Sequence, residues 1–351
     1  MYKKILRPLL FLLQPEAVHN LVMGLLRFAR YVPFAKSIMR AMFTDRDLSL
    51  EREVLGITFA NPVGLAAGFD KKADTYDMLG ALGFGFIEIG TVTPQPQPGN
   101  PKPRSFRLAK DNALINRMGI NNEGMEKVIG DLRGRNPGLV IGGNIGKNSS
   151  TPNNQAPADF LKIFRAMYDY VDYFTVNVSC PNVTNLRELQ DRGNMVEILG
   201  GLREFRKGQS EYRPILIKIS PDLTLEQVDV MIDVVKECRI DGIVATNTTT
   251  SREGLKTDAK IIDRIGNGGL SGAPLTERSL DMVRYISRKT EGKLPVMGVG
   301  GIMTVHDALR MLDAGACVVQ LYTGFIYNGP GFVKKICRSI ACRNAKPVAE
   351  K

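Results

Sequence analysis

The sequence predicts an α/β protein whose core is a (β/α)8 TIM barrel, a closed ring of eight parallel strands, with a small N-terminal helical extension. From residue 54 onward, short apolar runs rich in β-branched residues alternate with amphipathic helical segments. Strands that are apolar along their whole length are typical of parallel sheets covered by helices on the outside. Eight such runs follow one another, which is the number that closes this barrel.

The eight predicted strands and several of the helices between them can be placed along the chain. An open, doubly wound sheet is the alternative fold for this alternation. However, no predicted strand leads through a Gly-x-Gly-x-x-Gly turn into a helix, so nothing supports a dinucleotide-binding fold. The predicted strands are residues 62–67, 86–90, 139–145, 173–178, 215–219, 242–246, 295–299 and 317–322, and helical segments include residues 73–82, 160–170, 225–238, 276–289 and 305–314.

The first 43 residues differ in character from the rest of the chain. Pro8, Pro15 and Pro33 are expected to break them into short amphipathic helices. No apolar run among them approaches the roughly 20 residues that span a bilayer. Such helices either cap the barrel or lie on a membrane interface, and the two roles are compatible. We therefore expect a helical region at 1–43, a barrel at 44–340 and a C-terminal tail at 341–351.

The net charge of +11 is unevenly placed, because the first 43 residues carry seven basic side chains and only one acid, Glu16. Nucleic acid is one partner for such charge, but no nucleic-acid-binding motif or stripe of basic and aromatic residues occurs elsewhere. Basic residues mixed with apolar helices indicate an anionic membrane surface instead. The basic residues are Lys3, Lys4, Arg7, Arg27, Arg30, Lys36 and Arg40.

Cysteine and histidine usage excludes several classes of site. Five cysteines without paired short spacings argue against a disulfide framework, and two histidines, His19 and His306, cannot supply a zinc cluster. We therefore predict no metal site. A reducing, cytoplasmic compartment fits this composition best.

Cys180 is the most informative single residue of the chain. It follows a strand-like apolar run directly and stands between Ser179 and Pro181, with Asn177 and Asn182 close by. A buried cysteine usually behaves as a small apolar side chain, whereas this one falls on a loop rich in hydrogen-bonding groups, where functional side chains are displayed. The pattern predicts a proton-transfer residue with amides beside it that hold a polar ring.

The carboxyl ends of the predicted strands form a set with a clear chemical character. In a barrel these ends meet at one mouth, and here they bring amides, lysines, one thiol and no carboxylate pair. Amides can hydrogen-bond planar heterocycles because each offers a donor and an acceptor. Glycine-rich turns after the seventh and eighth strands suit a phosphate. The set therefore predicts FMN beside a planar, anionic substrate.

Two lysines of this set have predicted roles. Lys218 lies within the apolar run 215–219, where a buried charge needs a partner. A cation there would stabilise the anionic reduced flavin at its N1–C2=O edge. Lys71 follows Ala67-Gly-Phe-Asp, and we expect it to bind the carboxylate of the substrate.

At this point the sequence closely resembles the dihydroorotate dehydrogenases, over nearly its whole length. The helices at 1–43 and the stretch 102–107 resemble the membrane-associated, quinone-reducing class 2 enzymes. The motifs that carry the resemblance are Asn61-Pro-Val-Gly-Leu-Ala-Ala-Gly68, Glu88-Ile-Gly-Thr-Val-Thr-Pro94, Ile115-Asn-Arg-Met-Gly119, Asn177-Val-Ser-Cys-Pro-Asn182 and Gly268-Gly-Leu-Ser-Gly272.

The resemblance implies oxidation of (S)-dihydroorotate to orotate in pyrimidine biosynthesis, on the cytoplasmic face of the cell membrane as a peripheral protein. Cys180 would take the C5 proton, FMN the C6 hydride, and a membrane quinone would reoxidise the flavin. The residues implied to bind FMN are Ala67, Gly68, Phe69, Asp70, Lys71, Thr91, Asn144, Asn177, Lys218, Thr246, Gly272, Gly301, Tyr322 and Thr323. Those implied to surround dihydroorotate are Lys71, Asn116, Arg117, Met118, Gly119, Ile120, Asn177, Asn182, Asn247 and Thr248, and those implied to lie near the quinone path are His19, Arg107 and Tyr322.

Three positions depart from the class 2 pattern. Class 2 enzymes generally have serine where Cys180 stands, and cysteine there resembles the soluble class 1 enzymes. The stretch 183–187 lacks the usual Pro-Gly, and Ile120 replaces a phenylalanine found in some relatives. The alternatives are a class 1-like enzyme that uses fumarate or NAD, and a barrel that binds FMN or a pyrimidine without turnover.

Overall fold

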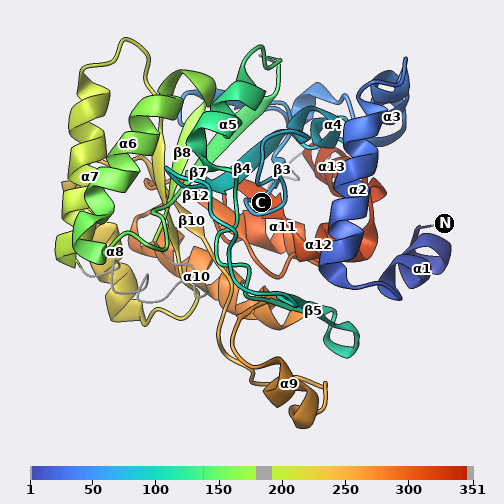
Figure 1. The fold of residues 1–351 in the computed structure, drawn as a ribbon. Helices are drawn as coiled ribbons and strands as arrows, with labels where there is room; N and C mark the ends of the chain where they lie inside the picture. The colour runs from blue at the N-terminus through green and yellow to red at the C-terminus, as the bar shows by residue number, and fades with distance from the viewer. Residues whose placement is uncertain (1, 137, 179–191, 346–351) are drawn as a thin grey trace, which may run out of the picture.

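Eight parallel strands close into a barrel at the centre of the computed structural model (Figure 1). The structure describes residues 2–136, 138–178 and 192–345. Around the barrel the strands follow their order in the chain, and the last pairs with the first. Each begins and ends within two residues of a predicted strand, so the predicted barrel is confirmed. The barrel strands are β3 (Val63–Leu65), β4 (Phe86–Val92), β7 (Val140–Ile145), β8 (Tyr173–Asn177), β9 (Ile215–Ile219), β10 (Gly242–Ala245), β12 (Val296–Val299) and β13 (Val318–Leu321).

Helices cover the outside of the barrel, and their apolar faces pack on the strands (Figure 1). The last of them, α13, runs across the boundary that the sequence suggested at residue 340. The covering helices are α4 (Tyr76–Gly80), α5 (Gly124–Leu132), α6 (Ala156–Met167), α7 (Arg192–Lys207), α8 (Leu225–Glu237), α10 (Thr276–Lys289), α11 (Val305–Asp313), α12 (Thr323–Asn328) and α13 (Gly331–Asn344).

The amino end of the barrel is closed by a short hairpin, β1 (Arg52–Val54) with β2 (Ile57–Phe59). Phe59, at the end of β2, is fully buried, and its ring centroid lies 5.0 Å from that of Phe86 and 6.5 Å from that of Tyr173. Glycines opposite two of these rings leave space for them, Gly64 under Phe86 and Gly142 under Tyr173. The interior is therefore filled at this end, and any cavity must open at the carboxyl ends of the strands.

A second, antiparallel sheet, which the sequence pattern did not predict, lies outside the barrel. It joins β5 (Ser105–Leu108), β6 (Ala113–Asn116) and β11 (Gly269–Gly272), in the order β11, β6, β5. A short helix, α9 (Ala259–Ile265), packs against it through Ile262 and Ile265. The sheet pairs Asn116 with Gly269, more than 150 residues further along the chain, and both Asn116 and Gly272 reach the barrel mouth.

The N-terminal segment forms helices on one side of the barrel (Figure 1), where α2 (Pro15–Ala29) packs against α4 and β5. A π-helical turn, Tyr2–Leu6, continues directly into α1 (Arg7–Phe11), so the predicted break at Pro8 is wrong: this proline sits in the first turn of α1, where its missing N–H is tolerated. Pro15 begins α2, and Pro33 separates α2 from α3 (Ala35–Phe43). Arg107 of β5 donates to the carbonyls of Phe11 and Leu13 and so holds the end of α1 on the sheet.

These helices expose much apolar surface. Of the eighteen large apolar side chains exposed in the described residues, thirteen belong to residues 1–43. Among the described helices, none alone has the length and apolarity to cross a membrane. The helices Tyr2–Phe11 and Pro15–Ala29 meet both conditions only when taken together, and they are bent by 119° at the break between them. The thirteen are Ile5, Leu6, Leu9, Leu12, Leu13, Leu21, Leu25, Phe28, Tyr31, Val32, Phe34, Ile38 and Met42.

Packing inside the barrel predicts that any side chain added at Gly142 lowers the stability of the fold. A Cβ on Gly142 would lie 2.2 Å from Cζ of Tyr173, and we expect Gly142→Ala to lower the free energy of unfolding by about 1–3 kcal/mol or more. Gly130 is the matched control, because it is exposed on α5 and a Cβ there would meet no atom within 4 Å. Gly130→Ala should therefore raise stability by roughly 1 kcal/mol. Urea unfolding of both variants checks this, and equal midpoints would contradict the packing account.

Candidate functional site

A deep pocket opens at the carboxyl ends of the barrel strands and is called here the mouth pocket. It encloses about 1060 Å³, including its open side. Most residues of the predicted cofactor and substrate sets line it together, although they come from several different barrel strands and from the antiparallel sheet. The lining residues from those sets are Ala67, Gly68, Lys71, Thr91, Asn116, Met118, Gly119, Ile120, Asn177, Lys218, Thr246, Asn247, Thr248, Gly272, Gly301, Tyr322 and Thr323.

Four predicted site residues lie elsewhere. Phe69 and Asp70 face the N-terminal helices, and Asn144 lies behind Thr91. The side chain of Arg117 turns away from the pocket: its guanidinium donates to the carbonyls of Ile265 and Pro103 and lies over the ring of Phe106. The guanidinium of Arg117 therefore does not line the mouth pocket, and its predicted place near the substrate stays a prediction. Cys180 and Asn182 lie outside the described residues.

The floor of the mouth pocket rests on the buried carboxylate of Glu88 in β4. Four side chains donate to it: Asn144 Nδ2 at 2.8 Å, Gln320 Nε2 at 2.7 Å, Thr175 Oγ1 at 3.1 Å and the hydroxyl of Tyr173 at 3.3 Å. All four neighbours act as donors, so the carboxylate is satisfied inside the barrel without a cation. Their strands, β7, β8 and β13, are thereby tied to β4.

From Glu88 a chain of hydrogen bonds leads up to the pocket wall. Asn144 accepts from Thr91 Oγ1, which accepts in turn from Asn177 Nδ2 at 2.9 Å. Asn177 then accepts from Asn247 Nδ2 at 3.3 Å. Each amide in the chain has its orientation set by the one below it, so the pocket presents amides that are already oriented for a ligand.

One end of the mouth pocket is built from backbone with almost no side-chain volume. Gly272 and Gly301 have φ angles of +104° and +70°, which favour glycine. A Cβ on Gly301 would lie 2.2 Å from Cα of Thr276, and one on Gly324 would lie 1.9 Å from the carbonyl oxygen of Ile302. This is a concave backbone surface of the kind that receives a phosphate through N–H groups.

The pocket also contains two lysines. Lys218 lies in β9 next to Asn177 of β8 and is only 6% exposed. Burial, together with the charge of Arg104, lowers the pKa of Lys71 to about 8, while Glu16 and Asp70 oppose this shift. An anion bound against Lys71 would favour its charged form. Among the described residues the pocket has two cations and no acidic lining residue, which indicates an anionic ligand.

A second pocket, the apolar pocket, lies between the N-terminal helices and the barrel and encloses about 1310 Å³ including open space. Its walls include Leu10, Val18, Val22 and Leu26 from α1 and α2 and Phe325 from α12. The three residues predicted near the quinone path, His19, Arg107 and Tyr322, all line it. It shares Lys71, Asn116, Met118, Ser271 and Tyr322 with the mouth pocket, so these residues form a common wall.

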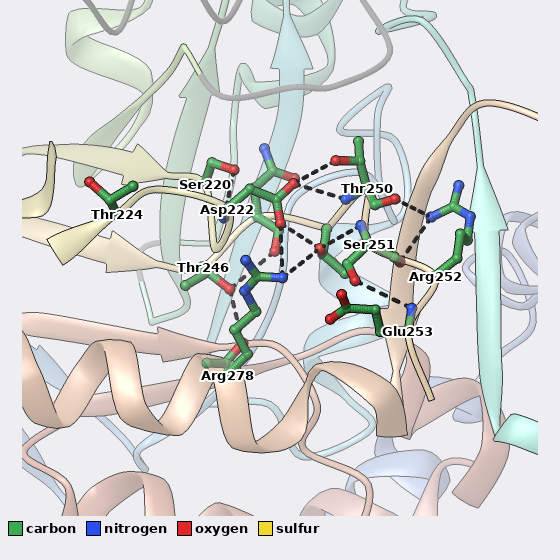
Figure 2. A network of polar contacts seen from close by, with 12 residues as sticks. Ser220, Asp222, Thr224, Thr246, Thr250, Ser251, Arg252, Glu253 and Arg278 are labelled. Carbon is green, nitrogen blue, oxygen red and sulfur yellow. Dashed lines mark hydrogen bonds and ion pairs between the residues drawn. The ribbon is translucent and has the colours of Figure 1, made fainter. Parts of the chain in front are cut away.

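The loop that carries Asn247 and Thr248 is anchored by Asp222 (Figure 2). The Asp222 carboxylate accepts from Thr249 Oγ1, from the backbone N–H of Thr250 at 2.9 Å and from its hydroxyl at 2.8 Å. Arg278 lies 3.5 Å from the same carboxylate. Burial acts to raise the pKa of Asp222, but these hydrogen bonds outweigh it and the pKa lies below its ordinary value.

Several lining residues were not predicted from the sequence. Gln320 lies within the last barrel strand, and Ser271, whose hydroxyl lies 2.8 Å from that of Thr323, belongs to the unpredicted sheet. Gln320 could have been found by the reasoning that singled out Lys218, because both are polar residues inside apolar strands. Ser271 could not, since its place depends on a sheet whose strands are more than 150 residues apart.

A closed (β/α)8 barrel with a polar, cation-bearing mouth pocket and an adjoining apolar pocket defines a cofactor-dependent barrel enzyme. The profile of the dihydroorotate dehydrogenase family matches residues 49–343, and the chain belongs to that family. A relative from Christiangramia forsetii named dihydroorotate dehydrogenase (quinone) is 52% identical over 97% of this chain and 98% of its own, and one of the same name from Kineococcus radiotolerans is 45% identical over 98% and 96%.

Solved structures agree with this assignment. The ligand-free DHODH of Eimeria tenella has a TM-score of 0.85 at 36% identity, over 94% of this chain and 96% of that one. The same enzyme in complex with ferulenol has a TM-score of 0.84 at 36% identity, over 93% and 90%. The predicted family, enzyme class and fold are confirmed.

The anchoring of the 246–250 loop leads to a prediction. Asp222→Ala leaves the donors of Thr249 and Thr250 without their acceptor, which costs about 1–3 kcal/mol locally. We expect amide hydrogen exchange at residues 248–250 to become about tenfold faster or more. Asp229→Ala on α8 removes a half-buried partner of Lys289 and Tyr285, away from this loop. It is the control and should leave the loop unchanged. Equal exchange in both variants would show that Asp222 does not hold the loop.

Proposed function

We propose that this protein oxidises (S)-dihydroorotate to orotate in pyrimidine biosynthesis, with FMN as its cofactor and a membrane quinone as the final electron acceptor. The observation that carries the proposal is the common wall between the mouth pocket and the apolar pocket. A polar anion on one side and a lipophilic acceptor on the other could then both reach one planar cofactor. We also propose that residues 1–43 form the access region for the quinone and residues 44–340 the catalytic barrel.

The residues of the mouth pocket fit FMN. The concave backbone surface at Gly272, Gly301 and Gly324 suits its phosphate, because the three glycines bring backbone without side chains, and a Cβ on any of them would overlap neighbouring backbone. The cation of Lys218 suits the edge of the isoalloxazine ring where negative charge collects. Thr91 and Asn177, held by Asn144, offer hydrogen bonds to its polar rim. When bound, FMN supplies hydride acceptance from C6 of dihydroorotate and electron transfer to the quinone.

We assign the substrate to the part of the mouth pocket beside Lys71. Its ammonium would pair with the carboxylate of dihydroorotate, and the amides of Asn116, Asn177 and Asn247 would hydrogen-bond the ring. Ile120 lines the same side and would pack on the ring. Asn182 is proposed from its sequence position only.

We assign the catalytic base to Cys180. It follows β8 by three positions, and Asn177, the last residue of that strand, lines the mouth pocket. A thiolate is a stronger base than an alcohol at neutral pH because a free thiol titrates near 8.5. Cys180 would take the C5 proton while the hydride leaves C6, and the C5–C6 bond becomes the double bond of orotate.

The quinone would enter the apolar pocket between α1 and α2. The exposed apolar side chains of residues 1–43, together with the basic residues of the same segment, suit contact with an anionic membrane surface. We therefore propose a peripheral protein at the cytoplasmic face of the cell membrane. His19, Arg107 and Tyr322 would contact the quinone ring, and of these Tyr322 belongs to the common wall with the mouth pocket.

One set of rapid-mixing experiments tests the proposed function. Dihydroorotate should bleach the flavin of the native enzyme, and Cys180→Ala should slow that step by about 10²-fold or more while flavin remains bound. The native rate should rise with pH as the thiol ionises. A bleaching rate in Cys180→Ala equal to the native one would remove Cys180 from the role of base.

The acceptor is tested with the reduced enzyme. A short-chain quinone should restore the flavin absorbance rapidly, whereas fumarate and NAD should not. Rapid reoxidation by fumarate or NAD without reoxidation by quinone would favour a class 1-like enzyme, and a purified protein without flavin would contradict the whole proposal.

A further inference from the structure

A third cavity, called here the polar cavity, lies between α2 and the loops that follow β3, β4 and β6. It encloses about 1060 Å³ including open space. Lys71 and Met118 line it and both other pockets, Asn121 lines it and the mouth pocket, and Glu16, His19 and Phe69 line it and the apolar pocket. The remaining lining residues are Asn20, Met23, Arg27, Asp70, Lys72, Asp74, Pro96, Gln97, Pro98, Asn122 and Glu123.

Two lining residues indicate that this cavity contains water. Asp70 Oδ1 and Asn121 Oδ1 are buried atoms without a hydrogen-bond partner in the described residues. Asp70 is fully buried, and its other oxygen accepts from the backbone N–H of Thr75 at 3.0 Å. Buried oxygens of this kind are normally satisfied by ordered water where the space is polar and large enough. Burial and the nearby charge of Asp74 raise the pKa of Asp70 to about 7, so this group can exchange protons near neutral pH.

The charges around the polar cavity do not suit an anionic ligand. Three basic lining residues face four acidic ones, and two of the basic residues are already paired, Arg27 with Asp74 at 2.9 Å and Lys72 with Glu123. Glu16 pairs with Arg104 at 2.8 Å. With these pairs formed, the lining carries little net charge and does not build a positive potential that would draw in an anion such as orotate. The basic residues are Arg27, Lys71 and Lys72, and the acidic ones Glu16, Asp70, Asp74 and Glu123.

His19 stands between this cavity and the apolar pocket. Its ring lies edge-on to that of Phe69, with centroids 5.1 Å apart, and in the described residues it makes no hydrogen bond to the protein. Burial, with the positive charges of Lys71 and Arg27, lowers its pKa to about 3, while Glu16 opposes the shift. His19 is therefore neutral, with one donor and one acceptor nitrogen available to water and to a ligand.

Three other polar side chains of the apolar pocket, Tyr2, Arg107 and Tyr322, are poorly suited to supply protons. The hydroxyls of Tyr2 and Tyr322 donate to backbone carbonyls, and burial raises the pKa of Tyr322 to about 12. Arg107 donates to the carbonyls at the end of α1. Lys71 is assigned to the substrate carboxylate.

We propose that the polar cavity is a water-filled proton inlet for quinone reduction, in which His19 passes protons from cavity water to a quinone in the apolar pocket. The proposal rests on the proposed function. A quinone becomes a hydroquinone by taking up two electrons and two protons. The C6 hydride of dihydroorotate supplies both electrons and one of these protons, whereas the C5 proton leaves on the side of Cys180. A proton must therefore reach the apolar pocket from water.

The proposed step conserves atoms and charge. The N–H bond of one imidazole nitrogen breaks as an O–H bond forms on the reduced quinone. The other nitrogen takes a proton from a cavity water, which regains one from bulk water. The imidazole returns to its first tautomer by exchange with the cavity water.

The test compares His19→Ala with native holoenzyme in rapid reoxidation of the flavin. At saturating short-chain quinone we expect reoxidation to slow by about 10²-fold, and added imidazole to restore much of the rate. Ferricyanide takes electrons without protons, so its reaction should be unchanged, as should flavin reduction by dihydroorotate. Val18→Ala is the matched control: it widens only the apolar pocket, and should raise the quinone concentration needed without lowering the saturating rate.

Three outcomes would overturn the proposal: an unchanged saturating quinone rate in His19→Ala, equal slowing with ferricyanide, or no restoration by imidazole. Failure of the native enzyme to react with quinone would instead overturn the proposed function.

A readout independent of turnover is ¹⁵N NMR of labelled histidine, since the chain has only His19 and His306. His306→Gln assigns the signals. His19 should be a neutral imidazole at pH 6, and an imidazolium there would contradict the relay.

Discussion

The carboxylate of Glu88, buried at the centre of the barrel, is the interaction on which the site depends. It gathers donors from three other strands and, through Asn144, Thr91 and Asn177, orients the amides of the mouth pocket. Loss of the carboxylate would leave four buried donors unsatisfied, each at a cost of about 1–3 kcal/mol. The same residues therefore stabilise the barrel and arrange its binding surface.

A single helix separates the environments that the proposed reaction needs. Along α2, Glu16, His19, Met23 and Arg27 face the polar cavity, while Val18, Val22 and Leu26 line the apolar pocket. Leu21, Leu25 and Phe28 remain exposed. Because these three sets recur at helical spacing, one segment can provide a hydrated wall, an apolar wall and a surface suited to a membrane.

Much of this architecture could be predicted from the sequence, and the parts that could not have a common physical cause. The barrel strands are apolar runs that can be recognised from the local sequence pattern, and the residues at their ends line one pocket. Glu88 is a charged residue inside the predicted strand 86–90, as Lys218 is in its own strand, but its partners could not be predicted, because its four donors come from residues 144–320 and only the closed barrel brings them together. The hairpin that ends in Phe59 and the sheet of β5, β6 and β11 likewise depend on pairing that local patterns do not reveal.

Side-chain direction was the other limit. Arg117 belongs to a motif that lines the mouth pocket through Asn116 and Met118, yet its guanidinium bonds to the carbonyl of Ile265 outside it. Pro8 was expected to break the N-terminal helical segment. It instead lies in the first turn of α1, which continues directly from the π-helical turn Tyr2–Leu6. Spacing identifies which residues share a region, whereas packing decides which way each one points.

The central claim is that dihydroorotate and quinone occupy different pockets that share one wall. The most direct test is the affinity of the oxidised flavoenzyme for orotate, titrated at increasing concentrations of a redox-inert quinone analogue. With separate pockets, the orotate Kd should stay within about threefold of its value without the analogue, a coupling below ~1 kcal/mol. An orotate Kd that rises in proportion to the analogue concentration would mean that the two ligands compete for one site, and would contradict the account.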